Sequence, residues 1–380
     1  MKKYIIILFL IFTNFLVFAS EVIEIPFYYD SEKKEMFVYA EIAGKKGYFL
    51  FDTGAFSSLI FDKKENYHNF NIVAENYNIK IEGMQHSASV YSIDNVVLAG
   101  NTLNINSYFM VSDNPNMRKK YIGLIGMNVF KDKMFEISMT DSVIRIHDKK
   151  PDAYKDFLPI QNYSSVELKV FVPITIDDKT YNAFVDTGAN YGENILLSPD
   201  VYDSKKSKHF KINTLSKSDS FIVEAESAEV MGVQFKNGDF ITHSIGLSEN
   251  IIGMKFLSLF DMLFDLRDEK KAVFYYKPRY PHEYFNFFIG RSGLKTIGIY
   301  HLDLFDHKHL IVTSIIEDSP AWKAGLRAGT LITHLNAKRV SEYSIEGIKI
   351  LIAGSEQLKI TYIDDKGKEK TVKIKPEKIL

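Results

Sequence analysis

Most of the chain between residues 23 and 278 alternates apolar and polar positions in short runs, the pattern of strands with one buried face. The segment "EMFVYAEIAGKKGYFLFD" (35–52) contains two such runs joined by a Gly-Lys-Lys-Gly turn, and "VELKVFVPITIDDKTYNAFVD" (166–186) repeats this hairpin with a turn at Asp177-Asp178. Further hairpins are predicted within 96–111 and 228–245, with Gly and Asn at their bends. Helical periodicity is scarce, so the sequence predicts mainly β units.

Two motifs recur in the same order and indicate an internal duplication. The stretches "FLFDTGAFSSLIF" (49–61) and "NAFVDTGANYGENILL" (182–197) both end an apolar run at Asp-Thr-Gly-Ala. Each is followed by Ile-Gly-Met and an alternating strand pair that ends at Lys-Pro, within 122–151 and 250–278. The aspartates lie 134 positions apart and the glycines of the second motif 127 apart. We therefore predict two equivalent β repeats, residues 20–151 and 152–278.

The acidic residue at the end of each apolar strand indicates a functional role for the carboxylate. A buried carboxylate is unfavourable unless it is paired or hydrogen-bonded. If the repeats pack about a pseudo-twofold axis, Asp52 and Asp186 meet, and like charges at close range share one proton. Such a pair can hold a water, with one carboxylate as general base and the other as acid toward a substrate carbonyl. Their roles cannot be divided from the sequence.

The residues that follow each aspartate suit a crowded site. Glycine lets the backbone approach without a Cβ, threonine offers a hydroxyl that can link the two loops, and alanine is small. The supporting positions predicted in this way are Thr53, Gly54, Ala55, Thr187, Gly188 and Ala189.

The two D-T-G-A loops, each followed by an apolar-apolar-Gly motif ending at Gly126 or Gly253, resemble retropepsin-like aspartic proteases, most closely bacterial members with a double motif. The resemblance covers roughly residues 24–277. It implies two β-barrel repeats in a pseudo-twofold protease, Asp loops cross-linked by threonines, and a Gly motif packed beneath each loop. One chain then forms the whole site as a monomeric pseudo-dimer, with a homo-oligomer as the alternative. Candidate substrate-covering hairpins are 82–89 and 216–223.

Two departures from the family pattern affect these expectations. The segment "NYGENILLSP" is longer than its counterpart "FSSLIFD", so the two halves differ around the site. Pepsin-like relatives carry a hydroxyl after the Gly, where this chain has alanine in both loops. The loss of a donor to the ionised carboxylate raises its pKa, so we expect a less acidic optimum than pepsin's.

From residue 293 the pattern changes to strand, turn, strand, and a short helix that Ser319-Pro320 begins and Gly325 ends. A second helix over 344–353 and a hairpin turning at 365–367 complete the unit. The stretch "SPAWKAGLRAGTLITHLNAKRV" resembles a bacterial PDZ domain, a β-sandwich with two helices, and the resemblance covers about residues 291–376. We place the domain at residues 293–380, after a linker at 279–292. The resemblance implies a groove for a C-terminal peptide, with binding residues Ile297, Gly298, Ile299 and Ile348. The alternative is a structural cap without a ligand.

Composition narrows the classes of function. The net charge of −1 over 380 residues gives no indication of a nucleic-acid partner. The absence of cysteine excludes disulfides, thiolate nucleophiles and cysteine-ligated zinc. The stretch "HLDLFDHKHL" (301–310) places His307 and His309 at i, i+2 without a clear third ligand, so it is interpreted as a solvated loop. We expect no metal and no cofactor.

The first 19 residues have the form of a signal peptide, with Lys2 and Lys3, an apolar core and Ala19 at a cleavage pattern. The apolar stretch is short for a span of about 20 residues, so cleavage is favoured over an uncleaved anchor. We therefore expect an exported protein, periplasmic or extracellular, without a stable membrane span.

Together these features predict an exported aspartic endopeptidase that acts on protein or peptide substrates, with a PDZ domain for substrate capture or regulation. One alternative is a non-catalytic envelope protein that binds peptides through the same cleft and the PDZ groove. Another is a processing enzyme that cleaves few substrates and depends on its PDZ domain. Degradation of an unfolded substrate, and its inhibition by aspartic-protease inhibitors, separates the enzyme from the binder.

Overall fold

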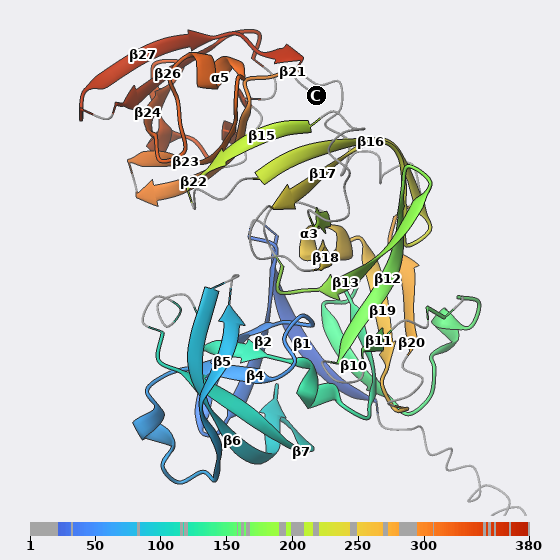
Figure 1. Ribbon diagram of the computed structural model, residues 1–380. Helices are drawn as coiled ribbons and strands as arrows, with labels where there is room; N and C mark the ends of the chain where they lie inside the picture. The colour runs from blue at the N-terminus through green and yellow to red at the C-terminus, as the bar shows by residue number, and fades with distance from the viewer. Residues whose placement is uncertain are drawn as a thin grey trace, which may run out of the picture.

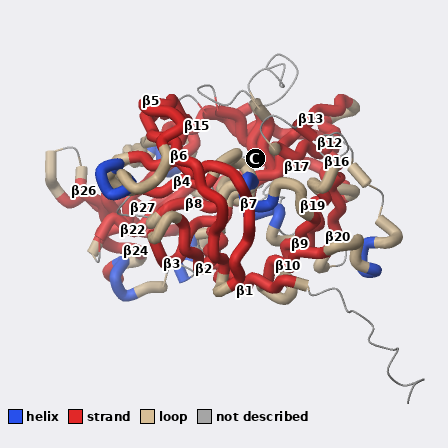
Figure 2. Tube along the Cα trace, turned by 90° about the horizontal axis from the view of Figure 1, so that it is seen from below, coloured by secondary structure: helices blue, strands red, loops and turns tan. Residues whose placement is uncertain are grey.

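The structure is a computed structural model, and its described part is mainly β with a C-terminal PDZ domain (Figure 1). Figure 2 shows that, among the described residues, helix occurs in short pieces between the strands. The expected signal peptide lies outside the described residues, as does most of the expected linker. The described residues are 22–31, 33–81, 84–114, 117, 121–157, 159–160, 163–164, 168–189, 195–198, 209–215, 220–243, 249–268, 273–280, 295–306, 308–344, 347–348, 351–352, 355–364 and 366–378.

The first repeat runs from the N-terminal strand through the blue and cyan part of Figure 1. Its core consists of alternating strand positions such as Ile25, Val38, Phe49 and Phe109, all fully buried. Its strands and 3₁₀ helices are β1 (Ile23–Asp30), β2 (Glu35–Ile42), β3 (Lys45–Phe51), β4 (Ser58–Phe61), η1 (Lys64–Tyr67), β5 (Ile72–Ile81), β6 (Met84–Leu98), β7 (Asn101–Ser112), β8 (Gly123–Ile125), η2 (Met127–Phe130), β9 (Met134–Ser138) and β10 (Val143–His147).

The second repeat follows the short helix η3 (Asp152–Tyr154) and has strands in the same order, although η1 has no counterpart among its described elements. These are β11 (Tyr163–Ser164), β12 (Lys169–Ile176), β13 (Lys179–Asp186), β14 (Ile195–Leu197), β15 (His209–Thr214), β16 (Ser220–Val230), β17 (Val233–His243), β18 (Asn250–Gly253), α3 (Met254–Leu257), β19 (Phe260–Asp265) and β20 (Val273–Pro278).

Strand pairing is repeated between the two halves. In the first, β8 lies between β3, which it pairs in parallel, and β4, which it pairs antiparallel. In the second, β18 lies in the same way between β13 and β14. The contacts β2–β6 and β12–β16 also correspond. The internal duplication inferred from the sequence motifs is therefore also present in the strand topology.

The halves join where β9 pairs antiparallel with β19, with Phe135 opposite Phe264 and Glu136 opposite Leu263. The rings of Phe135 and Phe264 stack with centroids 4.7 Å apart. The spacing of 127 residues that relates the two Gly motifs also relates Glu136 to Leu263. These two positions are therefore equivalent in the repeats and face each other at the pseudo-twofold axis.

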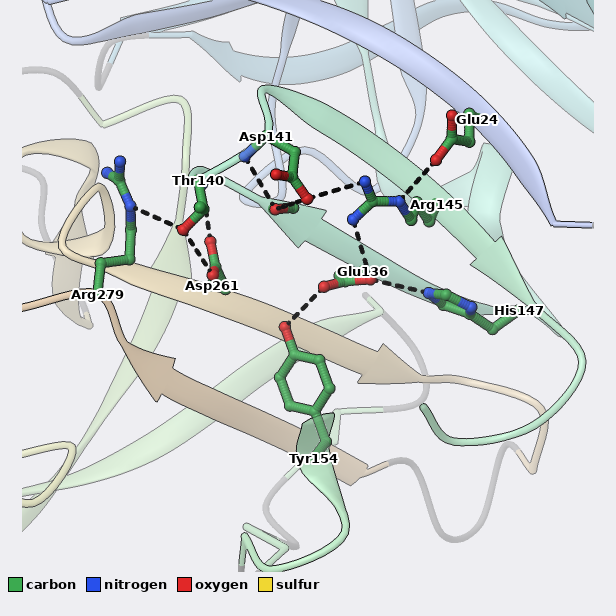
Figure 3. A network of polar contacts seen from close by, with 10 residues as sticks. Glu24, Glu136, Thr140, Asp141, Arg145, His147, Tyr154, Asp261 and Arg279 are labelled. Carbon is green, nitrogen blue, oxygen red and sulfur yellow. Dashed lines mark hydrogen bonds and ion pairs between the residues drawn. The ribbon is translucent and has the colours of Figure 1, made fainter. Parts of the chain in front are cut away.

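A polar network surrounds Glu136 on this joining sheet (Figure 3). Its carboxylate contacts His147 Nε2 at 2.9 Å, accepts a hydrogen bond from the Tyr154 hydroxyl at 3.1 Å, and lies 3.8 Å from an Arg145 nitrogen. Arg145 also pairs with Glu24 of β1 and with Asp141. The network thereby ties the segment between the repeats, through Tyr154, to the sheet that joins them.

Tyr154→Phe is expected to lower the free energy of unfolding by about 1.5–3 kcal/mol, the usual value of a hydrogen bond to a charged group. The Tyr154 side chain is almost fully buried, at 1% exposure, so no water replaces the lost hydroxyl as a donor to the Glu136 carboxylate. Urea unfolding measures the change. Tyr28→Phe, on a ring that is 59% exposed, is the control and is expected to change stability little. Equal effects of the two substitutions would contradict the structural role given to Glu136.

Two-residue turns close most of the hairpins, and one of them differs from the prediction. The β2–β3 turn lies at Ala43-Gly44, with φ of 51° and 79°, rather than at Gly-Lys-Lys-Gly; Lys45 already begins β3. Positive φ at both central residues matches the right-handed twist of the strands. The turn at Asp177-Asp178, with φ of 44° and 69°, is where the sequence predicted it.

The C-terminal unit has its own apolar core, which extends from Ile297 to Ile374. Ser319 caps α5 by accepting a hydrogen bond from the Trp322 amide at 3.3 Å, and Gly325 follows with a φ of +94°, as the sequence predicted. In the part of the chain that the structure describes, no helix has the length and apolar character needed to span a membrane. The elements are β21 (Lys295–Thr296), β22 (Ile299–Asp306), β23 (His309–Ile316), α5 (Pro320–Lys323), β24 (Leu331–Leu335), β25 (Lys338–Arg339), η5 (Val340–Glu342), β26 (Leu358–Ile363), β27 (Glu369–Ile374) and β28 (Glu377–Lys378).

Candidate active site

The two Asp-Thr-Gly-Ala loops lie at the ends of equivalent strands, β3 and β13. Each strand ends in three buried residues before its aspartate. The backbone amide of Asp52 donates to Ile125 of β8 at 3.0 Å, and Asp186 is in register with Gly253 of β18. The neighbouring strand thus holds each loop at its first residue, and both aspartates remain half-buried.

Each carboxylate is held in its own loop by backbone donors. Asp52 Oδ1 accepts hydrogen bonds from the amides of Gly54 at 2.8 Å and Ala55 at 3.1 Å. Asp186 Oδ1 accepts the equivalent bonds from its own loop at 2.9 and 3.1 Å. The Gly188 amide of the opposite loop provides a further hydrogen bond to Asp52.

The two threonines join the loops reciprocally. The amide of Thr53 donates to Thr187 Oγ1, and the amide of Thr187 donates to Thr53 Oγ1, both at 3.0 Å. Each hydroxyl donates in turn to a carbonyl of the opposite repeat, Thr53 to Val185 at 2.8 Å and Thr187 to Phe51 at 3.0 Å. Because both side chains are buried, water does not compete for these four bonds. The bonds therefore fix one loop against the other.

The glycines allow the carboxylates to come together. A Cβ added to Gly54 would lie 2.5 Å from Cγ of Asp186, and a Cβ added to Gly188 would lie 2.4 Å from Cγ of Asp52. Real Cβ atoms do not approach other atoms so closely, so only glycine fits at these positions. Each carboxylate therefore packs on the backbone of the opposite loop.

The glycines of the second motif lie against the same loops from the other side. A Cβ at Gly126 would be 2.8 Å from the Ala55 carbonyl oxygen, and one at Gly253 would be 2.7 Å from that of Ala189. The next amide along the chain donates to that carbonyl in both repeats, Met127 at 2.9 Å and Met254 at 2.8 Å. The structure thus brings all ten predicted residues of the carboxylate site together.

Burial and mutual contact change the acidity of the pair. Burial raises the pKa of Asp52, although hydrogen bonds from Asp186 and from backbone amides oppose that rise. Burial and then the negative charge of Asp52 raise the pKa of Asp186 well above its usual value. Two carboxyl groups that are hydrogen-bonded to each other in this way titrate as a unit that retains one proton.

Asp186→Asn is expected to stabilise the fold at pH 7. A raised folded-state pKa means that the unfolded chain loses its proton first, so stability is highest below the unfolded value of about 3.9 and falls as pH rises through the folded value. The neutral amide avoids this loss. Each kcal/mol gained corresponds to about 2–4 °C in melting temperature.

Thermal unfolding at pH 3.5 and pH 7 measures the effect, and the variant's advantage should be present only at pH 7. Asp261→Asn is the control, because Asp261 accepts two hydrogen bonds from Thr140, at 2.9 and 2.8 Å, and its replacement should destabilise. A lower stability of Asp186→Asn at pH 7 would contradict a shared proton.

Two asparagines that the sequence analysis missed support the site. Asn128 Oδ1 accepts from the Ser58 amide at 2.9 Å, and its Nδ2 donates to the Tyr108 carbonyl at 2.8 Å. Asn250 accepts from the Ser198 amide at 2.9 Å and donates to the Asn182 carbonyl at 2.9 Å. They brace β4 and β14 in the two repeats. In the sequence, both asparagines stand close to a Gly motif. Asn128 follows Gly126 whereas Asn250 precedes Gly253, so the two do not form a repeated pattern.

The residues predicted for a PDZ peptide site lie in the interior of that domain. Ile297, Ile299 and Ile348 are buried, at 0%, 8% and 3% exposure, within its core cluster. Gly298 has a φ of +86° between the two isoleucines. His309 lies 2.9 Å from Asp306, while His307 is outside the described residues. Binding by these residues stays a prediction. The hairpins proposed to cover substrate lie at the β5–β6 and β15–β16 connections, whose tips are also outside the described residues.

Comparison with known proteins supports one part of this description. A family model of the PDZ domain matches residues 311–362, so a PDZ domain is present in the C-terminal part of the chain. A search of curated proteins found no significant match.

Proposed function

We propose that the chain is an aspartic endopeptidase of the retropepsin-like type, which hydrolyses peptide bonds with water activated by Asp52 and Asp186. The observation that carries this proposal is the reciprocal linkage of the two loops through Thr53 and Thr187, which holds the loops of the two aspartates together. The raised pKa of Asp186, caused by burial and by the charge of Asp52, supports a pair that shares one proton. A purely structural strand end has no need for two such carboxylates. An acid and a base side by side are what amide hydrolysis requires.

The reaction would use the pair as follows. The ionised carboxylate accepts a proton from water as its oxygen bonds to the scissile carbonyl carbon, while the protonated carboxyl donates its proton to the carbonyl oxygen. As the tetrahedral intermediate loses its C–N bond, the proton taken from water passes to the amine nitrogen, and a hydroxyl of the intermediate returns its proton to the other carboxylate while the C=O bond reforms. The pair returns to its original state with one proton. Thr53 and Thr187 act as positioning residues that keep the carboxylates at this separation.

Apolar clusters beside the loops support a peptide substrate with apolar side chains. In the first repeat Leu50, Leu59 and Leu124 pack next to Ala55. In the second repeat the equivalent strands contribute a similar group next to Ala189, which consists of Phe184, Leu196 and Ile251. A peptide laid across the carboxylates would place its side chains near one cluster or the other.

The PDZ domain supports peptide binding as a second activity. Among the described strands, β22 pairs with β23 along one edge, so its other edge can accept an added strand. We propose that this edge receives a C-terminal peptide for substrate capture or regulation. Export to the periplasm or exterior, proposed from the first 19 residues, would place both activities outside the cytoplasm.

The test is cleavage of a denatured protein and a peptide mixture by residues 20–380 across about pH 3–8, a range that spans the expected values for the pair. Cleavage that a statine-containing peptide blocks, with an optimum above about pH 3, is the expected result. A folded protein that binds peptides but cleaves none of them at any pH would support the non-catalytic binding protein instead.

A further inference from the structure

The PDZ domain is joined to the second repeat by a continuous β ladder. Strand β15 of that repeat pairs antiparallel with β23 of the PDZ domain, with Ile212 opposite Ile316 and Thr214 opposite Ser314 (Figure 1). The Leu215 amide donates to the Thr313 carbonyl at 3.1 Å, and the Glu317 amide donates to the Lys211 carbonyl at 2.8 Å. The two units therefore share one sheet.

Side chains at both ends reinforce this ladder. Asn213 Oδ1 accepts a hydrogen bond from the Ala328 amide at 3.1 Å. Lys211 forms an ion pair with Glu317 at 3.7 Å. Leu215 approaches Gly329, whose added Cβ would be 3.6 Å from Leu215 Cδ2. Contacts from two PDZ segments, β23 with the adjoining Glu317 and the loop at 328–329, converge on β15 and fix the position of this strand.

Ile316 extends the contact to the carboxylate loop. Its side chain, 2% exposed, packs in the apolar cluster with Ile212, Phe184 and Ala189, the residue that follows the Asp186-Thr187-Gly188 loop. The adjacent Ile315 packs instead in the PDZ core. Alternation along β23 thus directs one isoleucine into each unit.

The first repeat closes its equivalent cluster with its own residues. Met117 and Tyr121, from the segment 113–122 between β7 and β8, pack there with Leu50 and Leu124. The corresponding segment of the second repeat, 244–249, is shorter. Among the described residues, the second cluster includes Ile316 of the PDZ domain, whereas the first includes no residue of that domain.

We propose that the PDZ domain is a structural part of the second half of the active site, where β23 holds β15 and Ile316 completes the apolar wall beside Asp186. This inference rests on the proposed aspartic-protease function. Ile316 is a positioning residue, because it acts through Ala189 and Phe184 rather than on the reacting atoms. The PDZ domain then determines the efficiency of the protease even for substrates that it does not capture.

The test compares Ile316→Ala with Ile311→Ala in the full chain. Ile311 lies on the same strand, is half-buried, and pairs with β24 away from β15. Three quantities are measured: kcat and KM on a short peptide without a free C-terminal carboxylate, affinity for a statine-containing peptide, and hydrogen exchange at the Leu215 and Glu317 amides. Exchange in the β12–β13 ladder reports whether the repeat is still folded.

For Ile316→Ala we expect kcat/KM and statine affinity to fall on the order of 10-fold to 100-fold, the effect of small displacements in an active site. Exchange at Leu215 and Glu317 should rise about 10-fold while β12–β13 stays protected. Ile311→Ala should leave all three near wild type. Unchanged exchange and unchanged kcat/KM in Ile316→Ala would overturn the proposal, and so would equal losses in both variants.

The same experiment separates the two levels of the proposal. If the wild type neither cleaves nor binds the statine peptide, the proposed protease function fails, and with it the assignment of Ile316 to an active-site wall. If the wild type cleaves, and Ile316→Ala exchanges faster at Leu215 and Glu317 but keeps its activity, the protease function stands. The inference about the PDZ domain is then wrong.

Discussion

Asp52→Asn and Asp186→Asn should each abolish peptide cleavage, with kcat lower by about 10²–10⁴-fold or more, the range for loss of a general acid or base. Each amide keeps the shape of the carboxyl group and its Oδ1 acceptor, but it cannot exchange the shared proton. Because the two groups act as one unit, the double variant should lose little more than either single variant. Cleavage of a fluorogenic peptide measures these rates.

Asp178→Asn is the matched control. This exposed residue lies in the turn immediately before β13, the strand that carries Asp186, and asparagine accepts its φ of 69°. It should retain full activity. Full activity in either Asp52→Asn or Asp186→Asn would show that the carboxylate pair does not carry the reaction.

Thr187→Val is expected to have the largest effect on stability, about 2–4 kcal/mol. The change removes a buried hydroxyl and leaves the Thr53 amide and the Phe51 carbonyl of the opposite repeat without their bonds at 3.0 Å, and an unsatisfied buried polar group costs about 1–3 kcal/mol. Activity should fall with it, since the two loops are then no longer fixed to each other.

Chemical denaturation of Thr187→Val and Thr187→Ser measures this effect, because serine keeps the hydroxyl and should keep most of the stability. Thr53→Val should behave alike. Since both threonines belong to one hydrogen-bonded unit, the double variant should lose less than the sum of the single variants. Equal stability of Thr187→Val and Thr187→Ser would contradict the reciprocal linkage.

Most of the local features of the chain follow from short stretches of sequence. The turn at Asp177-Asp178 and the cap at Ser319 were predicted from residues that favour those backbone conformations. The β2–β3 turn was misplaced because Gly44 and Gly47 both offer a turn, and only strand register decides between them.

The composition of the candidate site was also readable from the sequence, because each half carries its own copy of the same short motifs. Asn128 and Asn250 were not found, because they support β4 and β14 from different positions relative to the Gly motif and share no common pattern. Glu136 and Leu263 are equivalent in position but differ in chemistry. Their pairing at the pseudo-twofold axis therefore corresponds to no motif that repeats in the sequence.

The sequence alone determined the mainly β character, the duplication and the PDZ domain, because these depend on alternation, turn residues and motifs that act within a few residues. Only the tertiary structure decided that Thr53 meets Thr187 across 134 residues, and that β15 pairs with β23. Backbone hydrogen bonds between strand edges depend little on side-chain identity, so the partner of an edge strand is selected by the packing of whole units. Ile316 illustrates the result: an ordinary apolar residue of a PDZ strand becomes part of the wall beside Asp186 once that ladder forms.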